Sequence, residues 1–145
     1  MTDSPPLSGL KVSDLMSGNV ICINEEDTVS FVVKMFDRCH ISGAPVMNAM
    51  GDYVGVISKT DLFARELMDF LRNGGNPDHL TVGVIMNHCQ PITVNEDMSI
   101  EKAADLMLSN KIHRVFVKNR AGKISGVVSS YDILKVVALE NTVSP

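Results

Sequence analysis

Basic residues are few in this sequence, and they are scattered along it. The chain of 145 residues has 13 lysines and arginines against 17 aspartates and glutamates, which gives a formal net charge of −4. Binding to the phosphate backbone of DNA or RNA requires clustered lysine and arginine side chains. The shortage of positive charge therefore argues against a nucleic-acid partner.

Long apolar runs are also lacking. No stretch approaches the roughly 18 residues needed to cross a bilayer, and the opening residues MTDSPP do not form the basic and apolar segments of a signal peptide. The sequence therefore predicts no membrane partner and a cytoplasmic location. Its 45% hydrophobic and 21% charged residues are typical of a globular protein.

Cysteine is sparse and unpatterned. The three cysteines, Cys22, Cys39 and Cys89, are odd in number and show no C-x-x-C spacing. His88 stands beside Cys89, but no further ligands follow at zinc-site spacing. The pattern predicts reduced thiols in an intracellular protein, with no disulfide and no metal site.

The sequence does contain an internal repeat. Residues 19–63 align with residues 90–134 at a constant offset of 71 and without a gap, and 11 of the 45 positions are identical. The segment GVISKTD (55–61) aligns with GVVSSYD (126–132), and VSDLM (12–16) corresponds to VGVIM (82–86) at an offset of 70. The chain is therefore a duplicated unit.

Each copy predicts the same order of elements, β-α-β-β-α, with a short helix ahead of it. The signals are an apolar triplet, an amphipathic stripe, a glycine-centred hairpin and a second helix that begins near an aspartate. The stripe consists of Val29, Val32, Val33 and Phe36 in the first copy, and of Ile100, Ala103, Ala104, Met107 and Leu108 in the second. The hairpin glycines are Gly51 and Gly122, and the second helices begin at Asp61 and Asp132.

The repeat predicts the domain organisation. We expect an N-terminal tail (1–11), a first repeat (12–72), a linker (73–81), a second repeat (82–139) and a C-terminal tail (140–145). One copy would leave a face of its three-stranded sheet open, so each copy needs a partner. The predicted fold class is α/β, a mixed α+β arrangement of two repeats packed sheet to sheet about a pseudo-two-fold axis. Clefts between such halves are usual places for small ligands.

The repeated Ser-x-x-Asp pair, Ser58 with Asp61 and Ser129 with Asp132, has two interpretations. A serine and an acidic residue three positions later form a capping box at a helix start. The same groups could bind a ligand, because a carboxylate accepts hydrogen bonds from ribose hydroxyls and a helix N-terminus favours anions. Capping alone does not require the pair and the preceding Gly-Val to recur in both copies, and the residues leave both interpretations open.

Taken together, these segments resemble the cystathionine-β-synthase (CBS) domain family, and specifically a tandem pair, or Bateman module. The likeness extends from about Val12 to Val137 and is carried by GVISKTD, GVVSSYD, ISGAPVM, VSDLM and VGVIM. It implies that the chain binds AMP, ADP or ATP, or alternatively S-adenosylmethionine, in clefts between the two repeats. It implies no catalytic cofactor.

The resemblance also implies the site residues. The two aspartates would hold ribose, with the paired serines near ribose or phosphate: Ser58, Asp61, Ser129 and Asp132. Positions at the central strand would line the adenine or phosphate side: Ala44, His113, Arg114 and Val115. First-strand positions would flank the base: Ile21, Cys22, Ile92 and Thr93.

The two copies differ at several of these positions. KIHRVFV (111–117) resembles a stretch of the nucleotide-sensing subunit of AMP-activated kinase whose His-Arg pair faces phosphates; the alternative is a solvated strand edge. The first copy has Ser42-Gly43 in place of His113-Arg114, so we expect the ligand at Asp61 to receive Arg114 and the site at Asp132 to bind more weakly. Phe116 replaces the proline usual in the family and is expected to narrow one pocket.

The resulting expectation is a stand-alone regulatory module that senses energy or metabolite levels and acts in trans on a separate protein. We expect a homodimer, a disc of four repeats, formed through the apolar helices Leu62–Leu71 and Ile133–Leu139, although these helices could equally be intramolecular core. The alternative function is a structural or partner-binding pair with unoccupied clefts. The repeated groups supply no nucleophile with a matched base, so the sequence predicts no enzyme.

Overall fold

The computed structural model describes residues 7–18 and 20–143, with side chains through Leu139. The chain divides into two compact units. One contains residues 21–91 and is called the Asp61 unit. The other combines the described residues of 1–20 with those of 92–143 and is called the Asp132 unit.

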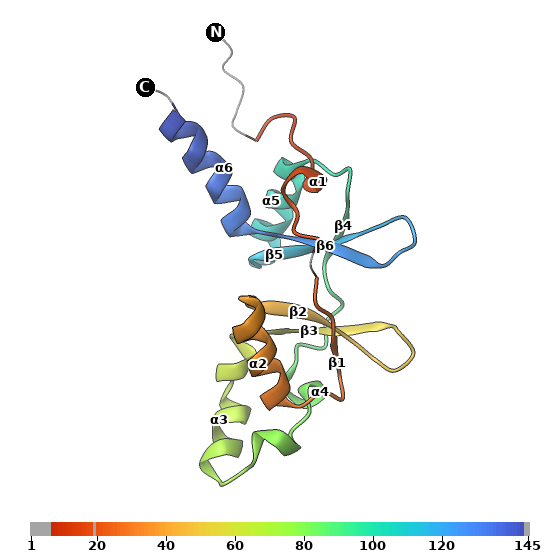
Figure 1. Ribbon diagram of the computed structural model, residues 1–145, viewed down its shortest axis with the longest axis vertical. Coiled ribbons are helices and arrows are strands. Elements are labelled where there is room, and N and C mark those ends of the chain that lie inside the picture. Colours follow the sequence, from red (N-terminus) through yellow and green to blue (C-terminus); the bar gives the residue numbers. More distant parts are fainter. Residues whose placement is uncertain (1–6, 19, 144–145) are drawn as a thin grey trace. The chain divides into compact units, whose positions relative to one another are not determined.

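The Asp61 unit is built on a three-stranded sheet in the order β1-β2-β3. Strand β1 runs parallel to β2, and β2 pairs with β3 as an antiparallel hairpin. The strands are Ile23–Asn24, Gly43–Met47 and Tyr53–Ser58. The helices are α2 (Val29–Cys39), the 3₁₀ turn η1 (Asp61–Phe63), α3 (Arg65–Arg72), the 3₁₀ turn η2 (Pro77–His79) and α4 (Val82–Ile85). Figure 1 shows α2 and α3 on the same face of this sheet.

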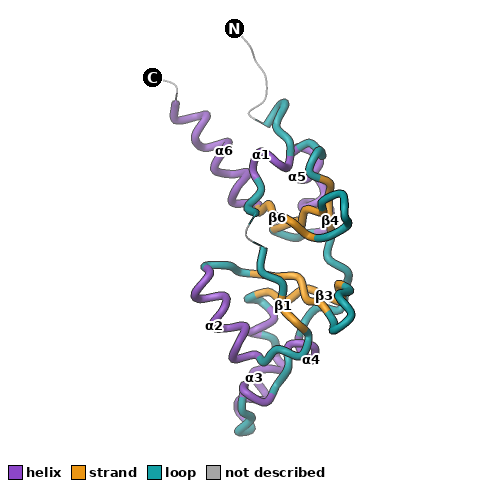
Figure 2. The backbone as a smooth tube through the Cα atoms, turned by 45° about the vertical axis from the view of Figure 1, so that its right-hand side comes forward, coloured by secondary structure: helices purple, strands orange, loops and turns teal. Residues whose placement is uncertain are grey.

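The Asp132 unit repeats this topology in the order β4-β5-β6. Its strands are Thr93–Asn95, Arg114–Lys118 and Ile124–Ser129. Its helices are α1 (Val12–Leu15), α5 (Ile100–Asn110) and α6 (Ser130–Val143). The bounds of β5, β6 and α5 match those of β2, β3 and α2 at the offset of 71, so the predicted β-α-β-β-α order is confirmed in both copies. Figure 2 shows the shared order of helix and strand along the chain.

Each unit has its own hydrophobic core between sheet and helices. In α2 the buried side chains are Val29, Val32 and Phe36, and in α5 they are Ile100, Ala103 and Met107. These positions follow the three- and four-residue spacing of one helix face. The predicted stripes were too wide, because Val33 is 47% exposed and Leu108 is 78% exposed.

The short leading helices pack against the opposite sequence repeat. In α1, Val12 N donates to Met98 O at 2.8 Å and Ser13 N to Glu96 O at 3.0 Å. In α4 the matching bonds go from Val82 N to Asp27 O at 2.8 Å and from Gly83 N to Glu25 O at 3.0 Å. Each compact unit therefore combines the leading helix of one sequence repeat with the strands and larger helices of the other.

Glycines on β3 and β6 make this exchange sterically feasible. The segment after α4 pairs with β3 through reciprocal bonds between Val56 and Asn87, both 2.9 Å. A Cβ on Gly55 would overlap the Asn87 carbonyl oxygen and would lie 2.9 Å from Met86 Sδ. Gly126 meets the segment after α1 in the same way, with Met16 Sδ 2.6 Å from its hypothetical Cβ. The neighbouring segment therefore accounts for both glycines, through a backbone carbonyl at Gly55 and through a methionine side chain at Gly126.

Two local features differ from the sequence expectation. The prediction of a single helix that begins at Asp61 is wrong for the first copy. Ala64 has an extended backbone (φ −62°, ψ 149°) and separates η1 from α3. In the second copy the helix is continuous and reaches Val143, beyond residue 139. The predicted tails fall partly outside the described residues.

The two leading helices differ in how their first turns are capped. Asp14 accepts a hydrogen bond from Lys11 N at 2.8 Å and caps α1. The corresponding residue in α4 is Val84, which is 66% exposed, and the N-cap residue Thr81 makes no side-chain capping bond.

We predict that Gly55→Ala lowers the free energy of unfolding by about 1–3 kcal/mol, the usual cost of forcing an extra carbon into a packed site. Gly126→Ala should cost less, because the nearest obstacle is a flexible methionine side chain rather than a carbonyl. Urea denaturation would measure both. Gly18→Ala is the control, since its Cβ would meet nothing within 4 Å among the residues that the structure describes. Equal stability of the Gly55 and Gly18 variants would contradict the steric account.

Candidate functional site

The Ser58–Asp61 pair closes a tight turn at the end of β3. Asp61 Oδ2 accepts two hydrogen bonds, from Ser58 N at 2.8 Å and from Ser58 Oγ at 3.1 Å. Lys59 N donates to Ser42 O at 3.0 Å, which ties this turn to the residue just before β2. Both Ser58 and Asp61 are half-buried. The serine hydroxyl here donates to the carboxylate and caps no helix.

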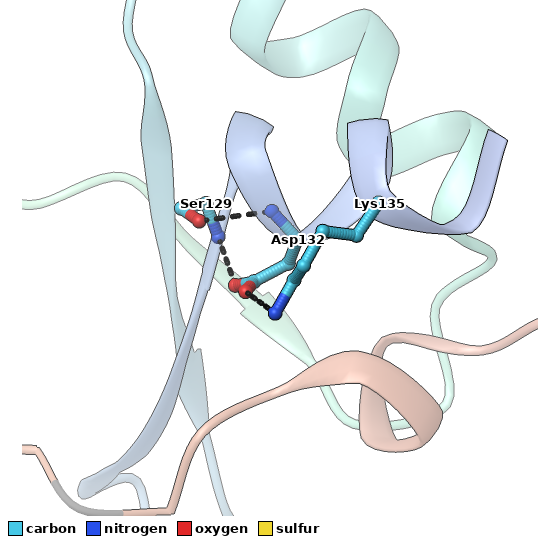
Figure 3. Close-up of polar contacts among 3 residues, drawn as sticks. All are labelled: Ser129, Asp132 and Lys135. Atoms are coloured by element: carbon cyan, nitrogen blue, oxygen red, sulfur yellow. Dashed lines mark hydrogen bonds and ion pairs between the residues drawn. The ribbon is translucent and has the colours of Figure 1, made fainter. Parts of the chain in front are cut away.

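The Ser129–Asp132 pair forms a reciprocal capping box at the start of α6 (Figure 3). Ser129 N donates to Asp132 Oδ2 at 2.9 Å, and Asp132 N donates to Ser129 Oγ at 3.2 Å. Serine at the N-cap and an acidic residue at the third helical position satisfy two backbone donors that the helix leaves unpaired. The capping interpretation is therefore correct for the second copy.

A lysine distinguishes the two aspartates. Lys135 Nζ lies 3.8 Å from Asp132 Oδ1 and 5.2 Å from the centre of the Tyr131 ring. The corresponding residue in the first copy is Ala64. In the described part of the chain, Asp61 Oδ1 has no hydrogen bond or ion pair. Among the described residues, the first copy thus presents one carboxylate oxygen without a partner, and the second presents a carboxylate engaged on both oxygens.

Sequence reasoning missed Lys135, although a signal for it existed. An acid and a base three residues apart on a helix are neighbours on its surface. The sequence places the helix start at Asp132, whereas α6 begins two residues earlier, at Ser130. Asp132 and Lys135 therefore lie on the same helix at a spacing of three residues.

The remaining predicted residues of the Asp132 unit gather at the same end of its sheet. Arg114 is the ladder partner of Ser129, and Ser130 N donates to His113 O at 2.8 Å. Phe116 N donates to Ile92 O at 3.0 Å, and Thr93 pairs with Phe116, which brings the start of β4 beside the start of β5. The seven predicted positions of this unit are Ile92, Thr93, His113, Arg114, Val115, Ser129 and Asp132.

The Asp61 unit collects its five predicted positions in the matching place. Gly43 is the ladder partner of Ser58, and Ala44 follows it in β2. Ile21 and Cys22 lead into β1, which runs parallel to β2. Within each unit, the structure therefore brings the predicted residues to one sheet end, where β3 or β6 finishes.

Two of the predicted positions lie in the hydrophobic core. Ala44 is 1% exposed and packs in the core of the Asp61 unit, and Val115 is fully buried in the core of the Asp132 unit. Their side chains face the protein interior. Any ligand contact from either position would be made by the backbone.

Two ionisable groups at these ends are perturbed by desolvation. Burial lowers the pKa of the Arg114 guanidinium from its ordinary value, although arginine remains charged at neutral pH. A cation held partly out of water gains from an anionic neighbour. Surrounding protein atoms raise the pKa of the Cys22 thiol, which disfavours its thiolate form, although the residue is partly open to solvent.

An apolar cavity between α5 and α6 was not predicted. Its volume is about 590 Å³. Its wall is mostly aliphatic, with polar groups at Lys111, His113 and Ser130. Leu108 and Leu134 line it and are 78% and 62% exposed, so this face of the Asp132 unit presents an open apolar surface.

The family is settled by comparison with known sequences. The sequence model of the CBS domain matches residues 12–67 and again residues 82–139. The chain belongs to the CBS domain family. The two matches correspond to the internal repeat, so the chain carries a tandem CBS pair, as the sequence motifs predicted.

Solved CBS domain structures have the same fold. One is the CBS domain pair of protein MJ0100 in complex with 5′-methylthioadenosine and S-adenosyl-L-methionine, with a TM-score of 0.73, 23% identity and coverage of 90% of this chain and 98% of that one. Another is CBSX2 in complex with AMP, with a TM-score of 0.70, 26% identity and coverage of 92% and 99%. The predicted fold class, two CBS repeats of mixed α/β structure, is confirmed.

Sequence relatives include proteins of very different length. The uncharacterized protein MJ1426 of Methanocaldococcus jannaschii is 26% identical, with 87% of this chain aligned to 90% of that protein. This chain spans only 64% and 41% of the next two relatives. Among the described residues, no helix has the length and hydrophobicity to cross a membrane.

The two serines should differ in their contribution to stability. Ser129→Ala removes the acceptor for a helix N–H and should cost about 1 kcal/mol, as loss of an N-cap does. Ser58→Ala leaves the Ser58 N–H bond to Asp61 intact and should cost clearly less. Urea denaturation of the two variants tests this difference, and a larger loss for Ser58→Ala would contradict the capping geometry.

Proposed function

We propose that this CBS pair is a regulatory module that binds an adenosine-containing ligand of the AMP, ADP or ATP class, with its ribose held by the repeated Ser-x-x-Asp pairs. The observation that carries the proposal is the recurrence of a half-buried hydroxyl and carboxylate at the same sheet end in both units. The AMP complex of CBSX2, which is 26% identical and has the same fold, supports this ligand class.

The chemistry of Asp61 suits a ribose. An ionised carboxylate only accepts hydrogen bonds, and the two ribose hydroxyls can donate to it. Oδ2 is occupied by Ser58 and holds the carboxylate in place, whereas Oδ1 has no partner in the described part of the chain. The turn thus fixes the orientation of the acceptor before a ligand arrives, which reduces the entropy lost on binding.

The second site should bind the same group less readily. A ribose at Asp132 would compete with Lys135 for the outer carboxylate oxygen. An ion pair whose lysine is mostly in solvent is worth only about 0–1 kcal/mol, so its loss would weaken binding by about fivefold at most. Asp132 therefore remains a binding candidate, with Asp61 the stronger one.

The groups that would meet phosphate lie beside the second pair. His113 is exposed, and Arg114 is partly desolvated at the start of β5. Charge-assisted hydrogen bonds from arginine to phosphate are among the stronger polar contacts in proteins. The assignment of Arg114 to the ligand at Asp61 stays a prediction from the sequence.

The proposal has three further parts. The module binds its ligand without catalysis, it regulates a separate protein in trans, and it is located in the cytoplasm. A ligand regulates only when it binds two states of the protein unequally. The competing function is a partner-binding pair in which the Ser-x-x-Asp groups act only as structural caps. The capping box at Ser129 and Asp132 favours that alternative for the second site.

Calorimetric titration with AMP, ADP, ATP and S-adenosylmethionine tests the proposal, with Asp61→Asn and Asp132→Asn as variants. Asparagine keeps one oxygen for the backbone N–H, so each variant should stay folded. It loses the second acceptor, so Asp61→Asn should weaken nucleotide binding by about tenfold or more. Asp132→Asn should have a smaller effect, because Lys135 already occupies that carboxylate.

The controls separate binding from folding. Urea denaturation of both variants should show stabilities close to that of the unmodified protein. If no adenosine ligand binds the unmodified protein, the proposal fails and the competing function, a partner-binding pair, is favoured. Nucleotide binding that is unaffected by either substitution would show that the ribose is held elsewhere.

We further propose that two copies associate through the α5–α6 face. A contiguous exposed apolar surface is unusual on a monomer and commonly marks an association site. Leu108 and Leu134 provide such a surface over a cavity of about 590 Å³. The sequence left two roles open for Ile133–Leu139, a dimer interface or intramolecular core. Ile133 belongs to the core, whereas Leu134 is exposed and available to an interface.

A double variant, Leu108→Glu with Leu134→Glu, should convert a dimer into a monomer, because burying two carboxylates in an apolar interface is costly. Sedimentation velocity measures the mass directly. Val84→Glu is the control, since Val84 is 66% exposed but lies on α4 in the other unit. A monomeric unmodified protein, or a dimer that survives the double substitution, would refute this interface.

A further inference from the structure

A second cavity of the Asp132 unit collects positive charge. Its volume is about 700 Å³, and three of its lining residues are cations from different elements. Lys102 comes from the first turn of α5, Lys118 is the last residue of β5, and Arg120 lies in the turn that connects β5 to β6. Few basic residues exist in this chain of net charge −4, so their convergence on one cavity calls for a physical reason.

The fold does not require these cations, because the first repeat builds the same local framework without them. The β2–β3 turn is closed by Asn48 Oδ1, which accepts from Met50 N and Asp52 N, both at 3.0 Å. The β5–β6 turn is closed identically by Asn119 Oδ1, at 3.0 Å and 3.1 Å. At the offset of 71, the first repeat has Phe31, Met47 and Ala49 where the second has Lys102, Lys118 and Arg120.

The lining of this cavity is more positively charged in the second repeat than the corresponding positions are in the first. The second repeat sets its three cations against two carboxylates, Glu96 and Asp97. Glu96 accepts a hydrogen bond from Ser125 Oγ at 3.3 Å, which orients this carboxylate without cancelling its charge. The corresponding positions in the first repeat contain Glu25, Glu26 and Asp27 and no basic residue. Only the second repeat can attract an anion here.

The cavity is separate from the candidate ribose site. Ser129 and Asp132 lie where β6 ends and α6 begins, whereas Lys118 and Arg120 lie at the opposite end of the same hairpin (Figure 1). Four residue steps along β5 separate Arg114 from Lys118, which corresponds to roughly 13 Å of strand. The cations are therefore not placed to serve a ribose at Asp132.

We propose that this cavity is a binding site for a small polyanion with at least two phosphate or carboxylate groups. Its volume lies within the range of small-molecule sites. Lysine supplies a mobile point charge and arginine a planar fork of donors, and both form charge-assisted hydrogen bonds with these oxyanions. Because the three cations come from different elements, they can contact separate anionic groups of one ligand at the same time. A ligand with a single oxyanion would contact fewer of them.

Inorganic pyrophosphate and citrate are suitable probes, because neither contains adenine or ribose. Titration of ¹⁵N-labelled protein, followed by amide NMR, should shift the signals of residues 95–99 and 118–120. The combined variant Lys102→Met, Lys118→Met and Arg120→Ala should bind the preferred probe at least about tenfold more weakly, or about 1.4 kcal/mol. Comparison of the probes shows whether phosphate or carboxylate is preferred.

The control variant removes three cations from elsewhere: Lys34→Met, Arg65→Ala and Arg72→Ala, all exposed residues of α2 and α3. Its affinity for the probe should change by less than about twofold, whereas an equal loss in both variants would show that only overall charge matters and would overturn the proposal. The proposal also fails if neither probe binds at about 10 mM, where a Kd of 1 mM would give near saturation. Shifts centred on Arg114, Ser129 and Asp132 would likewise reject it.

The nucleotide experiment remains independent. The cavity variant keeps both Ser-x-x-Asp pairs, so it should bind AMP as the unmodified protein does if the proposed function holds. The cavity would be refuted as a separate site if this variant lost AMP binding and the unmodified protein bound neither pyrophosphate nor citrate. The proposed function would stand in that case, because the unmodified protein would still bind AMP.

Discussion

The close approach of two backbones at Gly55 and Gly126 is the constraint on which each unit depends. At these positions a segment from the other sequence repeat pairs with the third strand, and a Cβ would overlap a backbone carbonyl at Gly55 and crowd a methionine side chain at Gly126. The pairing fixes α1 and α4 against sheets that are distant in sequence. The edge of β3 or β6 that would otherwise be unpaired gains hydrogen bonds, and the core below gains Val12 or Val82.

The same constraint positions the polar end of each sheet. Gly55 is three residues before Ser58, and Gly126 is three residues before Ser129. Once the strand is held against its neighbour, its last residue and the following turn have a defined direction, and the aspartate is held by Ser58 N or Ser129 N. Holding the turn or helix start is therefore compatible with binding a ligand, because the bonds from the serine use Oδ2 and leave Oδ1 to other partners. Preorganised acceptors of this kind lose little entropy when a ligand binds.

The sequence was sufficient for the fold class and the repeat, which follow from hydrophobic periodicity and from the 71-residue offset, both of which are local or periodic signals. The site residues were implied by the resemblance to the CBS domain family. The exchange of α1 and α4 between units has no such signal, since it depends on tertiary packing of four-residue helices. The break at Ala64 was equally hidden, because alanine is the strongest helix former. Lys135 was detectable by its spacing from Asp132, but only after the true start of α6 was known.

Because the chain is duplicated, each repeat serves as a control for the other. The comparison separates positions that folding explains from positions that it does not explain. Gly55 and Gly126 are identical because the backbone requires them, and both aspartates accept backbone hydrogen bonds. Folding thus explains why the glycines and the backbone-bonded oxygens recur, whereas the serine hydroxyls and the second carboxylate oxygens are not needed for those backbone bonds. The positions where the repeats differ on an unchanged framework carry more functional information, since folding does not account for the difference. Lys135, Arg114 and the three cations beside the β5–β6 turn belong to that class, and all of them add positive charge to the second repeat.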